Sequence, residues 1–152
     1  MGNISIKENI VNHISEIVEE KISGLRTALS SVKEARDGDT KSTAGDKHET
    51  GRAIMQRELE QLEQQLNNQI RLKSDLEQLD LSKNYDNAEA GSLVQTNEGI
   101  FYISVGLGKL DISGNTYFVI SPTSPIGSCM LGKSAGDKIS FQEREIEILG
   151  IE

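Results

Sequence analysis

The chain has 152 residues, which is room for one ordinary domain or two small ones. Apolar residues make up 36% of it and aromatic residues 4%, and tryptophan is absent, so large side chains for one compact core are scarce. The formal net charge is -8, and acidic residues outnumber basic ones on both sides of residue 80. Bulk attraction to phosphates is therefore not an evident source of affinity, and we expect any nucleic acid involved to be held by another protein.

The number of cysteines and the length of the apolar runs indicate the cellular compartment of the protein. Cys129 is the only cysteine, so the chain can form neither an intramolecular disulfide nor a cysteine-based metal site. Residues 1–21 mix apolar and charged side chains and lack the continuous apolar stretch of a signal peptide. No run approaches the roughly 18–20 apolar residues that span a bilayer. We therefore expect a cytoplasmic protein with no membrane partner.

Two long segments have the apolar spacing of helices. In residues 4–36 apolar side chains recur every seven positions, and residues 46–79 keep a helical period as well. The apolar residues of the second segment are Met55, Leu59, Leu62, Leu66, Ile70, Leu76 and Leu79. Between the segments, turn-forming and polar residues predominate. The pattern predicts an antiparallel coiled-coil hairpin over residues 1–80, with a polar tip at about residues 37–46 and an arm about 45 Å long.

The pattern changes after residue 80. Residues 81–91 are polar and predict a linker. Residues 92–152 alternate as strands do and predict an antiparallel β domain with one short helix. Strands are expected at 92–96, 100–105, 109–112, 116–121, 138–141 and 144–149, and the helix at 126–131. The predicted fold class is α+β.

Acidic residues gather in or beside the predicted tip: Asp37, Asp39, Asp46 and Glu49. Solvated carboxylates on a tip have no dry pocket, so they do not make a catalytic site alone. They can supply one or two oxygen ligands to a Mg²⁺ ion held elsewhere, and a second ion in such a site activates water for attack on a phosphodiester. The alternative is structural: Asp39 makes a turn, while Asp46 and Glu49 cap the second helix and complement its dipole.

The densest motif lies in residues 117–137, which read Tyr-Phe-Val-Ile-Ser-Pro-Thr-Ser-Pro-Ile-Gly-Ser-Cys-Met-Leu-Gly-Lys-Ser-Ala-Gly-Asp. This stretch resembles the C-terminal motif of the bacterial GreA/GreB transcript cleavage factors, a family of transcription elongation factors. That motif reads Ser-Pro-Ile-Gly, a short helix, Leu-Leu/Ile-Gly-Lys, two variable residues and Gly-Asp. The order of coiled-coil hairpin, linker and β domain resembles the same family at nearly the same length. The resemblance implies an FKBP-like fold for residues 92–152.

The resemblance also implies a mechanism. In that family the C-terminal domain docks at the rim of the secondary channel of RNA polymerase, and the hairpin enters the channel. Acids at its tip help to hold a second Mg²⁺ and a water, so that the polymerase cuts the 3′ end of a backtracked transcript. The chain would then be no enzyme itself. It would have no cofactor of its own, share Mg²⁺ with RNA polymerase, reach the nascent RNA only indirectly and act as a monomer.

Residues can be carried over from the family motif one by one. The candidates for contact with the polymerase are Ser124, Pro125, Gly127, Gly132 and Lys133, with the alternative that they only determine the fold.

The tip departs from the family pattern Gly-Asp-Leu-Ser-Glu-Asn-Ala-Glu-Tyr, in which the Asp and the first Glu are the working acids. Gly38-Asp39 matches Gly-Asp, which makes Asp39 the candidate Mg²⁺ ligand. Without gaps the Glu position falls on Ser42, which has no carboxylate. Asp46 and Glu49 are the candidates for the second acid if the turn is longer here.

Other functions stay open beside cleavage stimulation. A Gre-like protein can occupy the same channel and inhibit or modulate the polymerase without stimulating cleavage. An FKBP-like prolyl isomerase is disfavoured, because that activity needs an aromatic-lined pocket and the β domain has few aromatic residues and no tryptophan. A coiled-coil interaction module with no role at a polymerase is the remaining alternative.

Overall fold

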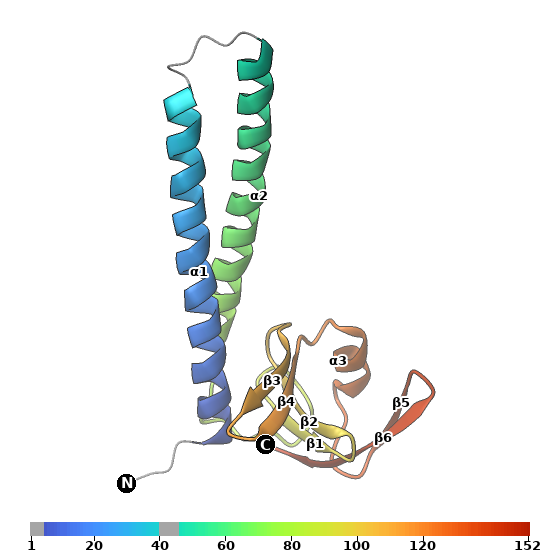
Figure 1. The fold of residues 1–152 in the computed structure, drawn as a ribbon. Helices are drawn as coiled ribbons and strands as arrows, with labels where there is room; N and C mark the ends of the chain where they lie inside the picture. The colour runs from blue at the N-terminus through green and yellow to red at the C-terminus, as the bar shows by residue number, and fades with distance from the viewer. Residues whose placement is uncertain (1–4, 40–45) are drawn as a thin grey trace. The chain divides into compact units, whose positions relative to one another are not determined.

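The computed structural model describes residues 5–39 and 46–152, except for the side chains of residues 39 and 46–49. Two long helices, α1 (Ile6–Asp39) and α2 (Asp46–Glu77), precede a six-stranded sheet and one short helix (Figure 1). This confirms the predicted α+β class. No helix within the described residues is both long enough and apolar enough to cross a membrane.

The chain divides into two compact units. One unit is Glu16–Ser74, the greater part of the helical hairpin. The other joins Met1–Ser15 to Asp75–Glu152, so the base of the hairpin belongs with the sheet. This division differs from the predicted one, in which residues 1–80 form a separate helical domain.

Helix α1 is capped by Ser5, the residue before its first turn. The backbone N–H of Glu8 donates to Ser5 Oγ at 3.1 Å, as at a helix N-cap. The helix ends at Asp39, three residues later than predicted. Residues 37–39 were expected in the turn, and that boundary is wrong. The segment has no proline to stop the helix, and Gly38 lowers helix propensity by only about 1 kcal/mol relative to alanine.

The seam of the hairpin in Glu16–Ser74 is apolar for most of its length. Val18, Ile22, Leu29 and Leu59 are buried. Ile70, predicted in the seam, is instead 40% exposed. The reason is heptad spacing, which places the residue seven positions after Leu62 in the seam; that residue is Gln69.

The sheet has the order β3-β4-β2-β1-β6-β5. The strands are β1 (Leu93–Thr96), β2 (Gly99–Ile103), β3 (Gly108–Ile112), β4 (Asn115–Ile120), β5 (Lys138–Phe141) and β6 (Arg144–Ile151). Neighbours pair antiparallel as expected, except that β2 and β4 pair in parallel, with Phe101 opposite Phe118. The sheet is therefore mixed. The parallel pair arises because β3 and β4 form a hairpin that returns β4, not β3, to the edge of β2.

Two tight turns fix the hairpins that the sequence predicts. Ser113 and Gly114 link β3 to β4 with φ of 50° and 84°. Gln142 and Glu143 link β5 to β6 with φ of 50° and 65°. Two successive positive φ values are the geometry whose twist matches that of the flanking strands.

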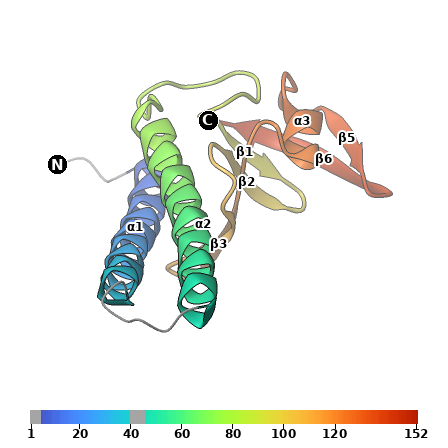
Figure 2. The same cartoon turned by 90° about the horizontal axis from the view of Figure 1, so that it is seen from above.

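The two faces of the sheet carry alternate residues of each strand. On one face, Phe101, Ile103, Ile146 and Ile148 form a core with Met130 of α3 (Pro125–Met130), which lies beside β5 in Figure 2. The rings of Phe101 and Phe118 stack with centroids 5.1 Å apart. On the other face, Leu93, Tyr102 and Val119 are also fully buried.

The predicted linker, residues 81–91, is part of the sheet-bearing unit. Tyr85 and Ala88 are buried. The Ala88 N–H donates to the Lys133 carbonyl at 2.8 Å, and the Ala88 carbonyl accepts from Gly132 N at 2.8 Å. The polar composition of residues 81–91 predicted a linker, but composition does not reveal backbone hydrogen bonds to residues distant in the sequence.

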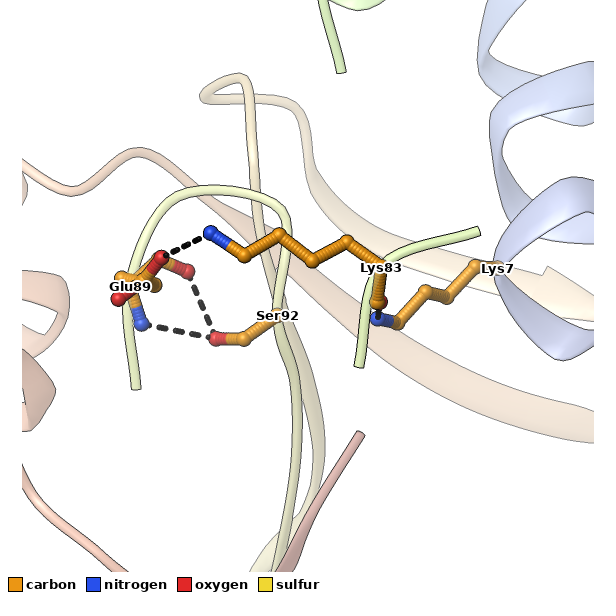
Figure 3. Close-up of polar contacts among 4 residues, drawn as sticks. All are labelled: Lys7, Lys83, Glu89 and Ser92. Atoms are coloured by element: carbon orange, nitrogen blue, oxygen red, sulfur yellow. Dashed lines mark hydrogen bonds and ion pairs between the residues drawn. The ribbon is translucent and has the colours of Figure 1, made fainter. Parts of the chain in front are cut away.

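Lys7 ties the start of α1 to this segment, as Figure 3 shows. Its side chain is 5% exposed, its Nζ donates to the Lys83 carbonyl at 3.1 Å, and it lies 4.6 Å from the centre of the Tyr85 ring. Lys83 pairs in turn with Glu89 at 3.3 Å, and Ser92 Oγ accepts from the Glu89 N–H at 3.0 Å. Burial lowers the pKa of Lys7, against the opposing charges of Glu152 and Asp80.

Candidate functional site

The backbone places the three tip acids at two helix ends. Asp39 is the last residue of α1, Asp46 is the first residue of α2, and Glu49 lies in the first turn of α2. Their side chains are outside the described part of the structure, and so is Ser42, between the helices.

The helix dipole affects an acid differently at the start and at the end of a helix. A carboxylate in the first turn of a helix is stabilised by the dipole, whereas one in the last turn is destabilised, each by about 0.3–1 kcal/mol at an exposed site. Asp46 and Glu49 are therefore explained by the stability of α2 alone. Asp39 is not, because it closes α1 where a lysine or arginine is favoured; Asp37, in the same turn, pairs with Arg36 at 3.3 Å.

The described residues contain no group of three or more His, Cys, Asp and Glu side chains that could hold a metal ion. Carboxylate oxygens are ligands that Mg²⁺ accepts, yet one or two of them do not make a complete site without further oxygen donors.

Residues 117–120 of the motif belong to β4, and the rest, the motif at residues 121–137, is held together by its own polar groups. Ser124 precedes the first residue of α3, Pro125, and its Oγ accepts from the Gly127 N–H at 3.1 Å while donating to the Ser121 carbonyl at 2.7 Å. It is a helix N-cap, and Pro125 is favoured at the first helical position because its missing N–H costs nothing there.

Gly127 has no room for a side chain. A Cβ on it would lie far inside van der Waals contact of the Ser121 carbonyl oxygen and 2.7 Å from Ser124 Oγ. The glycine of the Ser-Pro-Ile-Gly motif therefore lets α3 pack against the end of β4. This buried residue cannot present a side chain to a partner.

The second half of the motif forms turns that hold residues 87 and 88. Gly132 and Gly136 have φ of 80° and 94°, a left-handed backbone that glycine adopts without strain. The Asp137 carboxylate accepts from the Ser134 N–H at 2.8 Å, and Ser134 Oγ donates to Asn87 at 2.7 Å. Gly132 and Lys133 bind Ala88 through their backbones.

Of the five predicted contact residues, the structure leaves Pro125, Gly132 and Lys133 exposed, while Ser124 is half-buried and Gly127 buried. Leu131, between the motif's glycines, is 41% exposed and was not among the candidates. Nothing in the sequence indicated that Leu131 is exposed, since a leucine next to a helix usually packs in the core.

A second exposed leucine lies at a β-bulge. Thr96 of β1 pairs with Ile148 and Gln95 pairs with Gly150, so Leu149 has no partner on β1 and is 58% exposed. A bulge turns a side chain out of the alternating pattern. The sequence offered only the glycine after Leu149 as a signal of it.

Comparison with known proteins is sparse. No family model matches the chain, and no curated protein matches it. Among solved structures, it is similar to the GreA factor homolog 1 (Gfh1) protein of Thermus thermophilus, with 17% identity and a TM-score of 0.37 over 91% of this chain and 94% of that one. A second structure, of the transcription factor Gfh1, has 15% identity and a TM-score of 0.37 over 90% and 92%. Such values do not establish a shared fold or function.

Proposed function

We propose that the chain is a transcription elongation factor that binds RNA polymerase through its secondary channel and stimulates cleavage of backtracked RNA by the polymerase. Two observations together support this proposal. The chain contains the motif at residues 121–137, and the first helix of its two-helix arm ends with Asp39. Helix stability gives no reason for an acid at that position. The arm supplies reach, because α1 has 34 residues, about 50 Å at 1.5 Å per residue.

In this proposal Asp39 contributes a carboxylate oxygen to an ion whose other ligands come from the polymerase and the RNA. That ion is the second Mg²⁺ of the site, and when bound it would supply an activated water and stabilise charge on the phosphate oxygens. Asp46 or Glu49 would orient that water or complete the ligand set. The chain alone would cut no RNA.

Binding is tested by retention of the cognate core polymerase on the immobilised protein at low salt. Retention supports the proposal, and its absence contradicts a cleavage factor and a channel modulator alike. Cleavage is tested on a stalled, backtracked elongation complex, in which the protein should speed the release of short 3′ RNA fragments. Asp39→Ala should remove that acceleration while leaving retention unchanged.

A second candidate is a secondary-channel modulator that inhibits the polymerase without stimulating cleavage. Ser42 favours it, because a hydroxyl stands where the family pattern has its second acid. Binding without accelerated cleavage, together with slower nucleotide addition, would decide for this candidate. If cleavage is accelerated, Asp46→Ala and Glu49→Ala separate the two candidates for the second acid.

A prolyl isomerase gains no support from the fold. Phe101, Tyr102 and Tyr117 are buried, and Phe118 stacks on Phe101, so these rings fill the core and do not line an open pocket. A short Xaa-Pro peptide should isomerise at its uncatalysed rate in the presence of the protein.

A further inference from the structure

The arm has an irregular layer near its middle. Two contacts fix the antiparallel register of α1 and α2: Glu19 with Lys73 at 2.6 Å, and Arg36 with Gln56 at 3.3 Å. Between them, Gly24 faces the part of α2 that contains Gln69 across a groove of about 470 Å³. The groove is lined by Lys21, Gly24, Leu25, Gln65, Asn68 and Gln69.

Gln69 occupies a position that the heptad reserves for an apolar side chain. The residues at the same position one heptad away on either side are Leu62 and Leu76. The Oε1 atom of Gln69 is buried and accepts no hydrogen bond within the described residues. A buried acceptor without a donor is destabilised, and separating the helices would let water reach it.

The facing part of α1 is weak for independent reasons. Gly24 has the poorest helix propensity of any residue except proline. Apart from its chain neighbours and the nearby backbone of α1, no atom of the described residues lies within 4 Å of where its Cβ would be. One turn on, Thr27 Oγ1 donates to the Ser23 carbonyl at 3.1 Å. Such back-bonding often bends a helix. Both helices are therefore weakened in the same layer.

The layers on either side are well packed. Val18 and Ile22 are buried towards one end of this unit and Leu29 and Leu59 towards the other, with exposures of 7% or less. A soft layer between two firm ones is the arrangement of a hinge. We propose that the arm bends and opens reversibly at the layer of Gly24 and Gln69, and that the hinge is a property of the free protein.

Amide hydrogen exchange of the full-length protein tests the hinge without a polymerase. The amides of residues 23–27 and 66–70 should exchange faster than those of residues 14–18 and 58–62, because local opening exposes them first. Equal or slower exchange in the middle layer would overturn the proposal.

Two substitutions should close the hinge. Gly24→Ala adds a methyl group to open space and should slow exchange in this layer about fivefold, from the propensity difference alone. Gln69→Leu restores the heptad and removes the unpaired oxygen, and should slow it at least about fivefold more. The controls are Gly38→Ala, the same change near the end of α1, and Gln61→Leu on an exposed position of α2. If the controls slow exchange at residues 23–27 equally, or if the double variant Gly24→Ala, Gln69→Leu leaves that exchange unchanged, no hinge exists there.

Discussion

Two regions differ in how far stability explains their residues: the motif at residues 121–137, and the acids at the helix ends beside residues 40–45. In the motif, residues that looked like contacts for a partner have structural tasks: Ser124 caps α3, Gly127 admits a carbonyl oxygen, and Gly132 turns the chain. Asp39 differs in that it ends α1, a position where the helix dipole is unfavourable for an acid. A dense motif thus measures how strongly a fold is specified, whereas a residue that stability does not explain points to function.

The largest effect should be on RNA cleavage, when the acids at the helix ends are replaced by their amides. Asp39→Asn should reduce stimulated cleavage about 100-fold, since it removes the carboxylate that the proposal assigns to Mg²⁺. It should nevertheless raise the melting temperature slightly, because it relieves the unfavourable interaction with the helix dipole. Asp46→Asn and Glu49→Gln should both lower stability by about 0.5 kcal/mol. The measurements are RNA cleavage and thermal unfolding of the same preparations.

This comparison breaks if Asp39→Asn destabilises the protein as much as Asp46→Asn does. Asp39 would then have a structural partner, and its carboxylate would no longer stand out. Unchanged cleavage in Asp39→Asn would instead remove it from the proposed Mg²⁺ ligands while leaving the polymerase interaction possible.

Gly127→Ala should have the largest effect on stability, a loss of about 3 kcal/mol, because the methyl group collides with backbone and not with a movable side chain. Chemical denaturation of the variant measures it. The control is Gly106→Ala, whose Cβ would meet only Ser121 Cβ at 3.9 Å and should change stability by less than about 0.5 kcal/mol. A neutral Gly127→Ala would make this residue a possible contact again.

The sequence was informative wherever structure depends on local chemistry. Alternation and tight turns predicted the strands, and Pro125 and Gly132 bracketed α3 within one residue. It failed where distant residues decide. The parallel pairing of β2 with β4 and the docking of residues 81–91 depend on which strand edges meet. Gln69 was missed in favour of Ile70 because Ile70 is apolar and also fits a helical period, although the heptad spacing from Leu62 favours position 69.

Lys7→Ala should cost about 2 kcal/mol, between the effects at Gly127 and at Tyr102. The change leaves the Lys83 carbonyl without its donor and removes a cation from the Tyr85 ring. Lys21→Ala, on an exposed position of the same helix, is the control and should be nearly neutral. Equal effects of the two variants would mean that Lys7 does not hold the start of α1 to residues 80–89.

The smallest effect should be at Tyr102, on the buried face of the sheet. Its hydroxyl is buried and has no hydrogen-bond partner among the described residues, so Tyr102→Phe should be neutral or stabilise the protein by up to about 1 kcal/mol at pH 7. Urea unfolding measures the difference. A clear loss of stability would mean that the hydroxyl has a partner.

Alkaline pH turns the same substitution into a sharper test. Burial, and then the charge of Tyr85, raise the pKa of Tyr102 to about 12, above the value of about 10 expected in the unfolded chain. Below pH 10 the phenol is neutral in both states, so it contributes no pH dependence. Between pH 10 and 12 the unfolded chain releases the proton first, and the wild type loses stability as the pH rises.

Tyr102→Phe should reduce that loss. Ser104→Ala is the matched control, because Ser104 Oγ is also buried without a partner among the described residues but does not titrate. At pH 7 the stability of Ser104→Ala should resemble that of Tyr102→Phe. Above pH 10 Ser104→Ala should lose stability as the wild type does. If both variants follow the wild type in alkali, the raised pKa of Tyr102 is not linked to folding. The buried surroundings of Tyr102 would then tolerate charge better than their burial indicates.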